Sequence, residues 1–529
     1  MSSESFLPPG ARNQTEVFAV HGADPEVLAY AMAKYSRSAL SMRESLAEIS
    51  RQRAEQFLNT FYFQYGHRSI ADLAHVAFAV ERLSLLAAIV LVDEQRWDGQ
   101  ERSTRYQNFL KSGWFFPDFG ADSASAQLYS ETITNLFDAY QRTTTAVLDA
   151  LRRRVPCPEA MKPEAYERTL KARAFAVARY LLPLATNTSL GQIVNARTLE
   201  TQVSRLLSHP AAEVRDLGVK LREAATGPAW SVNAQAGAEL VEKISAADPT
   251  LTEEAAALLT AEVRTAPTLV KYAQPNDYEL QTRAELTQAA KELLGSLPQA
   301  VAPVVDLVEP TETLEVELAS TLLYSVSHHS YRQIRDLVAA LPEARVNEII
   351  ELGLRHRGKH DEALRAFHAG AALRFDILMD IGGFRDMHRH RRCTQIIQPF
   401  TALHGYETPT SGDLGPDVSI LAEAGVLAGF QAALDRAHAA SVRIANKPTP
   451  EAAQSALYLL PLATRIRSLF KMDFAEAQYI IELRSGPAGH FSYRRVAWEM
   501  FLALQRQHPA LAKHIRVTDF TQPIDLLKR

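Results

Sequence analysis

The spacing of apolar residues predicts helices in several parts of the chain. Between Ala165 and Leu182 apolar side chains recur every three or four positions and Pro183 ends the run, which predicts a helix. The uncharged run Leu83–Val92 predicts a short buried helix. Because no uncharged apolar run approaches about 18 residues, the pattern predicts no membrane-spanning segment.

Short apolar segments predict a strand near the start of each half of the chain, at Glu16–Val20 and at Leu314–Ala319. Farther along the second half, the apolar spacing from Ile377 to His388 predicts a helix, which two adjacent glycines, Gly382 and Gly383, weaken.

An internal repeat decides the domain organisation. The heptapeptide Tyr-Leu-Leu-Pro-Leu-Ala-Thr occurs at Tyr180–Thr186 and again at Tyr458–Thr464, an offset of 278 residues. A period this long indicates duplicated domains and not a solenoid. We predict a first copy over residues 1–290, a linker over 291–312 and a second copy over 313–529.

Composition narrows the class of protein. The chain has 529 residues, of which 47% are hydrophobic and 22% charged, as is ordinary for a soluble globular protein. Its net charge of −4 provides no basic field for nucleic acid, so local arginine clusters would have to bind any anion. The two cysteines, Cys157 and Cys393, are far apart and no secretory signal opens the sequence, so we expect a cytoplasmic protein.

Two segments carry candidate chemistry. The triplet Arg389-His390-Arg391 is costly to bury unless an anionic ligand lies against it. The segment Gln100–Tyr106 offers an acid, two hydroxyls and two arginines, which suit a phosphate and the polar edge of a uracil-like ring. A solvated loop is the alternative interpretation of the second segment.

Taken together, these segments resemble the flavin-dependent thymidylate synthases. In that family they form one continuous signature, Arg-His-Arg-x-x-Ser-x-(Asn/Gln)-Glu-x-Ser-x-Arg-Tyr, whereas here they lie almost 300 residues apart. The resemblance assigns substrate binding to Glu101, Ser103 and Arg105. The resemblance assigns flavin binding and catalysis to Arg389, His390 and Arg391. Thr394 stands in place of the usual serine.

Further family motifs are divided between the copies. Arg179, in Ala-Arg-x-x-Leu-Pro, matches a nucleotide-binding arginine, and Arg484 of the second copy matches another. Asn195 and Arg197 match the Asn-x-Arg motif that touches the flavin.

The Gly-His-x-Ser motif of the family, which also lies at the flavin, is matched by His67 and Ser69. Asp72 stands where the family has glutamate, and Leu73 where it has histidine.

The missing motifs are complementary. The first copy reads Asp93-Glu94-Gln95 where the Arg-His-Arg triplet belongs, and the second reads Ile397–Thr401 where the substrate loop belongs. This division predicts one composite site for each pair of copies, the reciprocal site being inactive.

The resemblance implies an α/β fold in two tandem copies, each with a mixed sheet flanked by long helices. It implies reductive methylation of dUMP to dTMP with FAD, NADPH and methylenetetrahydrofolate, in a homodimer. A flavoenzyme acting on another pyrimidine nucleotide and a non-catalytic nucleotide- or flavin-binding regulator remain open.

Two other features of the sequence have simpler interpretations. Histidines pair at His328-His329 and alternate at His388 and His390, but no third ligand set accompanies them, so we predict no metal site. Cys393 is predicted to be a small buried hydrophobe and not a nucleophile.

Overall fold

The computed structural model describes residues 24–34, 68–271, 273–299, 301–309, 313–358, 361, 363–368, 373–409, 414 and 418–527. The chain divides into two compact units. Unit 1 comprises residues 1–76, 195–197 and 222–272, and unit 2 comprises residues 77–194, 198–221 and 273–529. These units differ from the predicted copies, whose boundaries stay a prediction.

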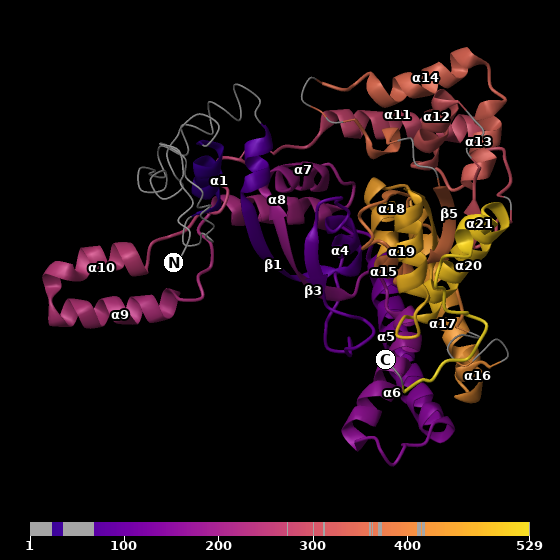
Figure 1. The fold of residues 1–529 in the computed structure, drawn as a ribbon, viewed down its shortest axis with the longest axis horizontal. Coiled ribbons are helices and arrows are strands. Elements are labelled where there is room, and N and C mark those ends of the chain that lie inside the picture. Colours follow the sequence, from indigo (N-terminus) through magenta and orange to yellow (C-terminus); the bar gives the residue numbers. More distant parts are fainter. Residues whose placement is uncertain are drawn as a thin grey trace, which may run out of the picture. The chain divides into compact units, whose positions relative to one another are not determined.

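The chain repeats one order of elements (Figure 1). The first series is β1 (His75–Ser84), α4 (Leu85–Leu91), β2 (Asp98–Glu101), α5 (Ser123–Arg154), α6 (Pro163–Ala178) with the 3-10 turn η3 (Arg179–Leu181), β3 (Asn187–Asn195), α7 (Ala196–Leu207) and α8 (Ala212–Thr226). The second series is β5 (Leu373–Asp380), α15 (Ile381–Met387), β6 (Thr394–Ile397), α17 (Leu427–Ala445), α18 (Pro450–Leu457), β7 (Arg465–Met472), α19 (Phe474–Ser485) and α20 (Phe491–Gln507). The α/β fold in two tandem copies is confirmed.

The remaining described elements precede, join or follow these two series, except α16, which lies between β6 and α17. They are α1 (Pro25–Lys34), η2 (Arg68–Leu73), α9 (Ala234–Ala247), η4 (Pro249–Leu251), α10 (Thr252–Leu259), α11 (Asp277–Leu294), β4 (Val305–Leu307), α12 (Leu314–Tyr324), α13 (Tyr331–Ala339), α14 (Glu343–Leu354), η5 (Arg365–Phe367), α16 (Ile420–Glu423) and α21 (Pro509–Ala512).

The repeated heptapeptide lies where the two copies meet. Each heptapeptide donates two backbone N–H groups to the other. The bonds run from Leu184 N to Leu460 O, from Ala185 N to Tyr458 O, from Leu462 N to Leu182 O and from Ala463 N to Tyr180 O, at 2.9–3.1 Å. Such a reciprocal exchange is the mark of a local twofold relation. Both copies therefore need the same backbone path at this point.

The strands form two small sheets, ordered β1-β3-β2 and β4-β5-β7-β6. Every pairing whose register is described is antiparallel, so the expected mixture of strand directions is not seen in these pairs. Along β5, Phe375 and Ile377 face the main core, which also holds Val496 and Met500 of α20. The helices α11–α14 cover the opposite face, where Leu469 of β7 joins their own apolar cluster (Figure 1).

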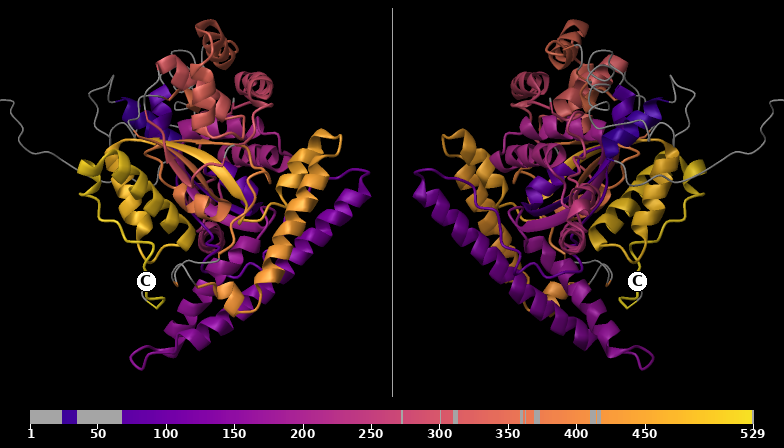
Figure 2. Two further views of the ribbon diagram at one scale, coloured as in Figure 1. Left: turned by 90° about the vertical axis from the view of Figure 1, so that its right-hand side faces the viewer. Right: turned by 90° about the vertical axis from the view of Figure 1, so that its left-hand side faces the viewer.

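Two long helices, one from each copy, flank the apolar core that the copies share. Figure 2 shows α5 and α17 running side by side, and Ile133, Leu136 and Tyr140 of α5 share one buried cluster with Phe430 and Leu434 of α17. The long flanking helices of the expected fold are thus present. Among the described residues, no helix is both long and apolar enough to cross a lipid bilayer.

Local predictions had mixed outcomes. The helix expected over Ala165–Leu182 is confirmed as α6 with η3, and the run Leu83–Val92 contains the buried helix α4. The strand expected at Leu314–Ala319 is wrong, because Thr313 caps the helix α12 there and its side chain accepts the Val316 N–H.

The helix expected from Ile377 to His388 begins only at Ile381, since Ile377 lies in strand β5. The short apolar run did not distinguish a strand end from a helix start. The strand expected at Glu16–Val20 falls outside the described residues.

Candidate functional site

The loop after β2 carries Arg105 to the second copy. Arg105 N donates to Ser103 Oγ (3.2 Å), which shapes the turn. Its Nη1 donates to Tyr493 Oη and its Nη2 to the carbonyl of Ala488, both at 2.7 Å. The loop predicted to bind substrate in the first copy is therefore tied to the α19–α20 region of the second.

Arg179 is a buried cation with unused donors. It lies in η3, directly after α6, and only 2% of its surface is exposed. Its Nη1 is 3.4 Å from Asp386 Oδ2, and its buried Nε and Nη2 have no hydrogen-bond partner within the described part of the chain. Burial lowers the pKa of Arg179 from its usual value. A buried guanidinium with spare N–H groups is suited to receiving an anion.

Asp386, in α15, is the carboxylate that these cations face. Although burial acts to raise it, the pKa of Asp386 is lowered, because the charges of Arg179, Arg105, Arg484 and Arg389 all favour its ionised form. We call these four arginines with Asp386 the arginine cluster. One carboxylate among four guanidinium groups leaves an excess of positive charge, as a phosphate requires.

Glu101 is also bound to the second copy. It forms an ion pair with Arg385, and the side chains of both residues are nearly buried. The strand β2 and the helix α15, almost 300 residues apart in sequence, are thereby joined directly beside Asp386.

His390 is held in one tautomer by its neighbours. Arg484 Nε donates to His390 Nε2 at 2.7 Å, so the ring proton lies on Nδ1, which is 3.6 Å from Glu476 Oε1. Burial lowers the pKa of His390 and the charge of Arg484 acts in the same direction, while Glu476 opposes them. The imidazole is therefore neutral at pH 7 and accepts the bond that orients Arg484.

The two arginines of the triplet differ in their surroundings. Arg389 is exposed, and its charge acts on Asp386. Arg391 Nε and Nη2 donate to the carbonyls of Glu94 and Val92, both at 2.8 Å, and its guanidinium lies 4.5 Å from the centre of the Trp97 ring. Because carbonyls at a helix C-terminus attract a cation, Arg391 is directed to the end of α4 and not to the arginine cluster.

The residues predicted to contact flavin from the first copy belong to unit 1. Arg197 Nη1 forms an ion pair with Asp72 Oδ2 at 3.1 Å. Asn195 ends β3, and Ser69 lies in η2. His67 lies outside the described residues.

The reciprocal position, where the first copy lacks the triplet, is filled by ion pairs. Arg365 pairs with Asp93, and Arg205 Nη2 lies 2.8 Å from Glu94 Oε1. Although burial acts to raise it, the pKa of Asp93 lies well below its usual range because of the charges of Arg365, His388 and Arg205. An anion would meet two carboxylates here.

Cys393 lies next to the triplet but is not activated. It is buried, and burial raises the pKa of its thiol to about 12, so it stays protonated at neutral pH. Among the described residues, no group of histidine, cysteine, aspartate and glutamate has the geometry of a metal site.

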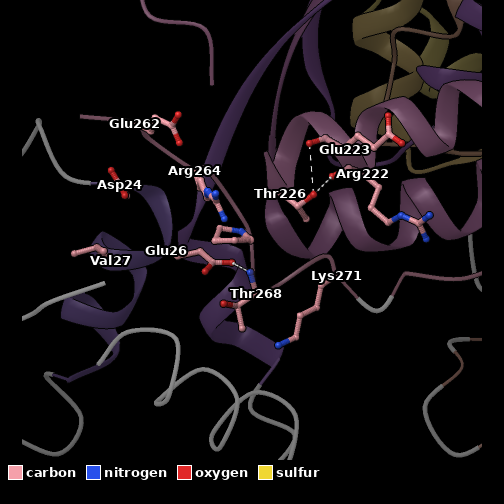
Figure 3. Close-up of a pocket in the computed structure, with 11 residues that line it drawn as sticks. Asp24, Glu26, Val27, Arg222, Glu223, Thr226, Glu262, Arg264, Thr268 and Lys271 are labelled. Carbon is pink, nitrogen blue, oxygen red and sulfur yellow. Dashed lines mark hydrogen bonds between the residues drawn. The ribbon is translucent and has the colours of Figure 1, made fainter. Parts of the chain in front are cut away.

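Unit 1 contains a pocket of about 670 Å³ with none of the predicted site residues in its lining (Figure 3). Acidic and basic side chains both line it, among them Glu262, Arg264 and Lys271. Glu26 Oε1 accepts the N–H groups of Thr268 and Leu269, at 2.9 and 2.7 Å.

The structure thus gathers Arg105, Arg179, Arg389 and Arg484 around one carboxylate, with Glu101 and His390 beside them. Sequence reasoning missed Asp386 and Tyr493. Asp386 lies within three residues of the triplet, but a single acid in a basic run gave no sign that it faces inward. Nothing local distinguishes Tyr493 from other helix tyrosines.

Fold and site together define a duplicated α/β protein with a cluster of arginines contributed by both copies. Residues 18–227 and 309–510 match the family model of Thy1, the thymidylate synthase complementing protein. The matches span more than half of the chain, so the chain belongs to this family of flavin-dependent thymidylate synthases, as two tandem copies.

The chain is also similar to proteins of its own length. A UPF0159 protein of Chlamydia muridarum (strain MoPn / Nigg) is 27% identical, with 94% of this chain and 91% of the relative covered. One of Chlamydia pneumoniae is 27% identical, with 97% and 93% covered. The UPF0159 protein Ta1429 of Thermoplasma acidophilum is 24% identical, with 92% and 94% covered.

Among solved structures, a flavin-dependent thymidylate synthase ThyX from Helicobacter pylori, complexed with FAD and dUMP, is 16% identical. The match covers 38% of this chain and 89% of that one. Its TM-score is 0.25, which is too low to support a structural comparison.

Proposed function

We propose that this protein is an FAD-dependent thymidylate synthase that methylates dUMP to dTMP with methylenetetrahydrofolate and NADPH. The observation that carries the proposal is the arginine cluster, in which guanidinium groups from both copies converge with buried donors unused. Membership of the family supplies the reaction class.

The nucleotide phosphate is assigned to Arg105, Arg179 and Arg484. Charge-assisted bonds from arginine forks are the strongest hydrogen bonds to phosphate that side chains make. Arg179 is already desolvated, so a dianion placed against its Nε and Nη2 would satisfy donors that are otherwise left without partners. Ser103 supplies a hydroxyl on the same loop as Arg105.

The flavin is assigned to His67, Ser69, Asn195, Arg197 and the triplet. Arg389 fits such a ligand, because its exposed guanidinium makes no ion pair with any residue that the structure describes. FAD, when bound and reduced by NADPH, supplies the hydride that completes the transferred methyl group. Arg389, placed next to a bound flavin, would favour negative charge on the reduced ring.

The roles of His390 and Arg391 follow from their contacts. His390 is proposed to act as a neutral acceptor that holds Arg484 in place, since it would lose this bond on protonation. Arg391 is proposed to tie the triplet to the C-terminal end of α4, while Arg389 faces the ligands.

A second candidate is a flavoenzyme of the same fold for another pyrimidine nucleotide. Asp386 favours it, because a carboxylate accepts hydrogen bonds and would select a base that presents an exocyclic amino group, which uracil lacks.

Folate-dependent release of tritium from 5-tritiated dUMP tests the proposal. Release by protein loaded with FAD and supplied with NADPH is the expected result. An FAD-binding protein that is inert on dUMP but turns over another pyrimidine nucleotide would favour the second candidate. A protein that binds nucleotide without flavin would indicate a regulator and refute the enzyme.

A further inference from the structure

Tyr493, in the first turn of α20, contacts two of the arginines assigned to the nucleotide. Its hydroxyl accepts the bond from Arg105 Nη1 at 2.7 Å. The guanidinium carbons of Arg105 and Arg484 lie 5.7 and 5.4 Å from the centre of its ring, within the range of cation–π attraction. One buried side chain therefore touches a cation from each copy.

The counterpart of Tyr493 in the first copy is apolar. Ser492 bonds the N-cap residue Asp380 of α15, and Glu213 bonds the N-cap residue Ser84 of α4, which aligns α20 with α8. In this register Tyr493 corresponds to the buried Val214.

The counterparts of the two arginines have changed as well. Arg105, Arg484 and Tyr493 occur together at the arginine cluster, and the reciprocal positions hold Thr401, Leu206 and Val214. All three polar side chains are thus present at one site and absent from the other. A tyrosine needed only for packing would have no reason to occur only at the site that also holds the two arginines.

From these contacts we infer that Tyr493 is a positioning residue that orients Arg105 and Arg484 on the phosphate of the nucleotide. The inference rests on the proposed nucleotide site. Arginine loses several rotamers when it binds, so a neighbour that fixes its guanidinium beforehand strengthens the complex. Tyr493 does this with its hydroxyl for Arg105 and with its ring for Arg484.

A glycine in the turn before α20 makes room for the tyrosine ring. A Cβ added at Gly489 would lie 2.6 Å from Tyr493 Cε2. Gly489→Ala is therefore expected to displace the ring without removing any charge, which provides a second way of testing the same contact.

The direct test is titration of the full-length protein with dUMP. Tyr493→Phe removes the hydroxyl and keeps the ring, and should weaken dUMP binding by about 5- to 20-fold. Tyr493→Leu removes both contacts and should weaken it further. Tyr406→Phe is the matched control, because it also removes one tyrosine hydrogen bond, to Asp435, far from the cluster in sequence and contacts. It should leave dUMP binding unchanged.

A double-mutant cycle distinguishes positioning from a structural role. In an Arg105→Ala background, Tyr493→Phe should weaken dUMP binding by less than about twofold, since the hydroxyl has no guanidinium left to orient. Equal effects of Tyr493→Phe in both backgrounds would overturn the inference. The inference would also be overturned if the wild-type protein binds dUMP and Tyr493→Phe binds it with the same affinity. Absence of dUMP binding by the wild-type protein would instead refute the proposed function, and the inference with it.

Discussion

Ser84 and Asp380 occupy the same place in the two copies, before α4 and α15, and each caps its helix. Ser84 Oγ donates to Glu213 Oε2 at 2.6 Å, whereas Asp380 accepts from Ser492 Oγ. In the first copy the carboxylate belongs to Glu213 of α8, whereas in the second it belongs to the N-cap residue Asp380. Burial raises the pKa of both acids. At the residue scale the copies keep an interaction here while exchanging its chemistry, whereas the cation Arg105 has only the uncharged Thr401 at the corresponding position of the second copy.

Replacing Arg105 with alanine should weaken dUMP binding by about 10- to 150-fold, because it removes a charge-assisted bond to phosphate worth about 1.5–3 kcal/mol. Thr401→Ala, at the corresponding position of the second copy, should change binding little. Calorimetric titration of both variants measures the difference. Equal losses would mean that both reciprocal sites bind nucleotide.

His404 should make the protein sensitive to mild acid. Burial, with Arg467 and His328, lowers its pKa to about 4, below the ordinary 6.5. Above pH 6.5 the residue is neutral in both states and contributes nothing. As the pH falls below 6.5 the unfolded chain takes up the proton first, so stability is lost until about pH 4, by about 2 kcal/mol at pH 5.

His404→Gln should therefore reduce the fall in unfolding free energy between pH 7 and pH 5, measured by urea denaturation. His514→Gln, at an exposed histidine, is the control and should leave the fall unchanged. An identical pH dependence in both variants would contradict the assignment.

At the element scale, the second sheet carries buried charges on the face that α11–α14 cover. Glu317 of α12 pairs with Lys471 Nζ (2.9 Å) and Arg374 Nη2 (3.1 Å). Beside them, Arg467 pairs with Asp376 at 2.9 Å. Since desolvated charges are tolerated only when paired, the sheet and α12 depend on each other.

Glu317→Ala should lower the free energy of unfolding by about 3–5 kcal/mol, because it removes the carboxylate that two buried cations share. Glu348→Ala breaks an ion pair with Arg345 whose side chains are both about half exposed, and should cost about 0–1 kcal/mol. Chemical denaturation compares the two. Similar losses would show that the buried network contributes no more than a surface pair.

At the scale of the whole molecule, the arginine cluster closes within one chain, since Arg105 and Arg179 of the first copy contact Tyr493 and Asp386 of the second. We propose a homodimer that carries one FAD and one functional site per chain. Light scattering should give twice the chain mass. A fully active monomer, or nearly two FAD per chain, would refute this assembly.

Mixing an Arg105→Ala chain with an Arg484→Ala chain tests the closure directly. Both residues belong to one cluster, so no mixed dimer should regain tight dUMP binding. Recovery of about a quarter to a half of the sites on mixing would show instead that the cluster forms across chains.

The sequence alone determined the duplication, the division of the family signature between the copies, and the helices α4 and α6. These depend on identity, spacing and local periodicity, which neighbouring residues carry. Tertiary structure decided that Asp386 faces four arginines and that Arg391 donates to carbonyls directly after α4, and it showed that Leu314–Ala319 is helical. The first two outcomes depend on burial and on contacts between residues far apart in sequence, which a short segment does not encode. The third depends on the Thr313 cap, a local signal that the alternation of apolar residues obscured.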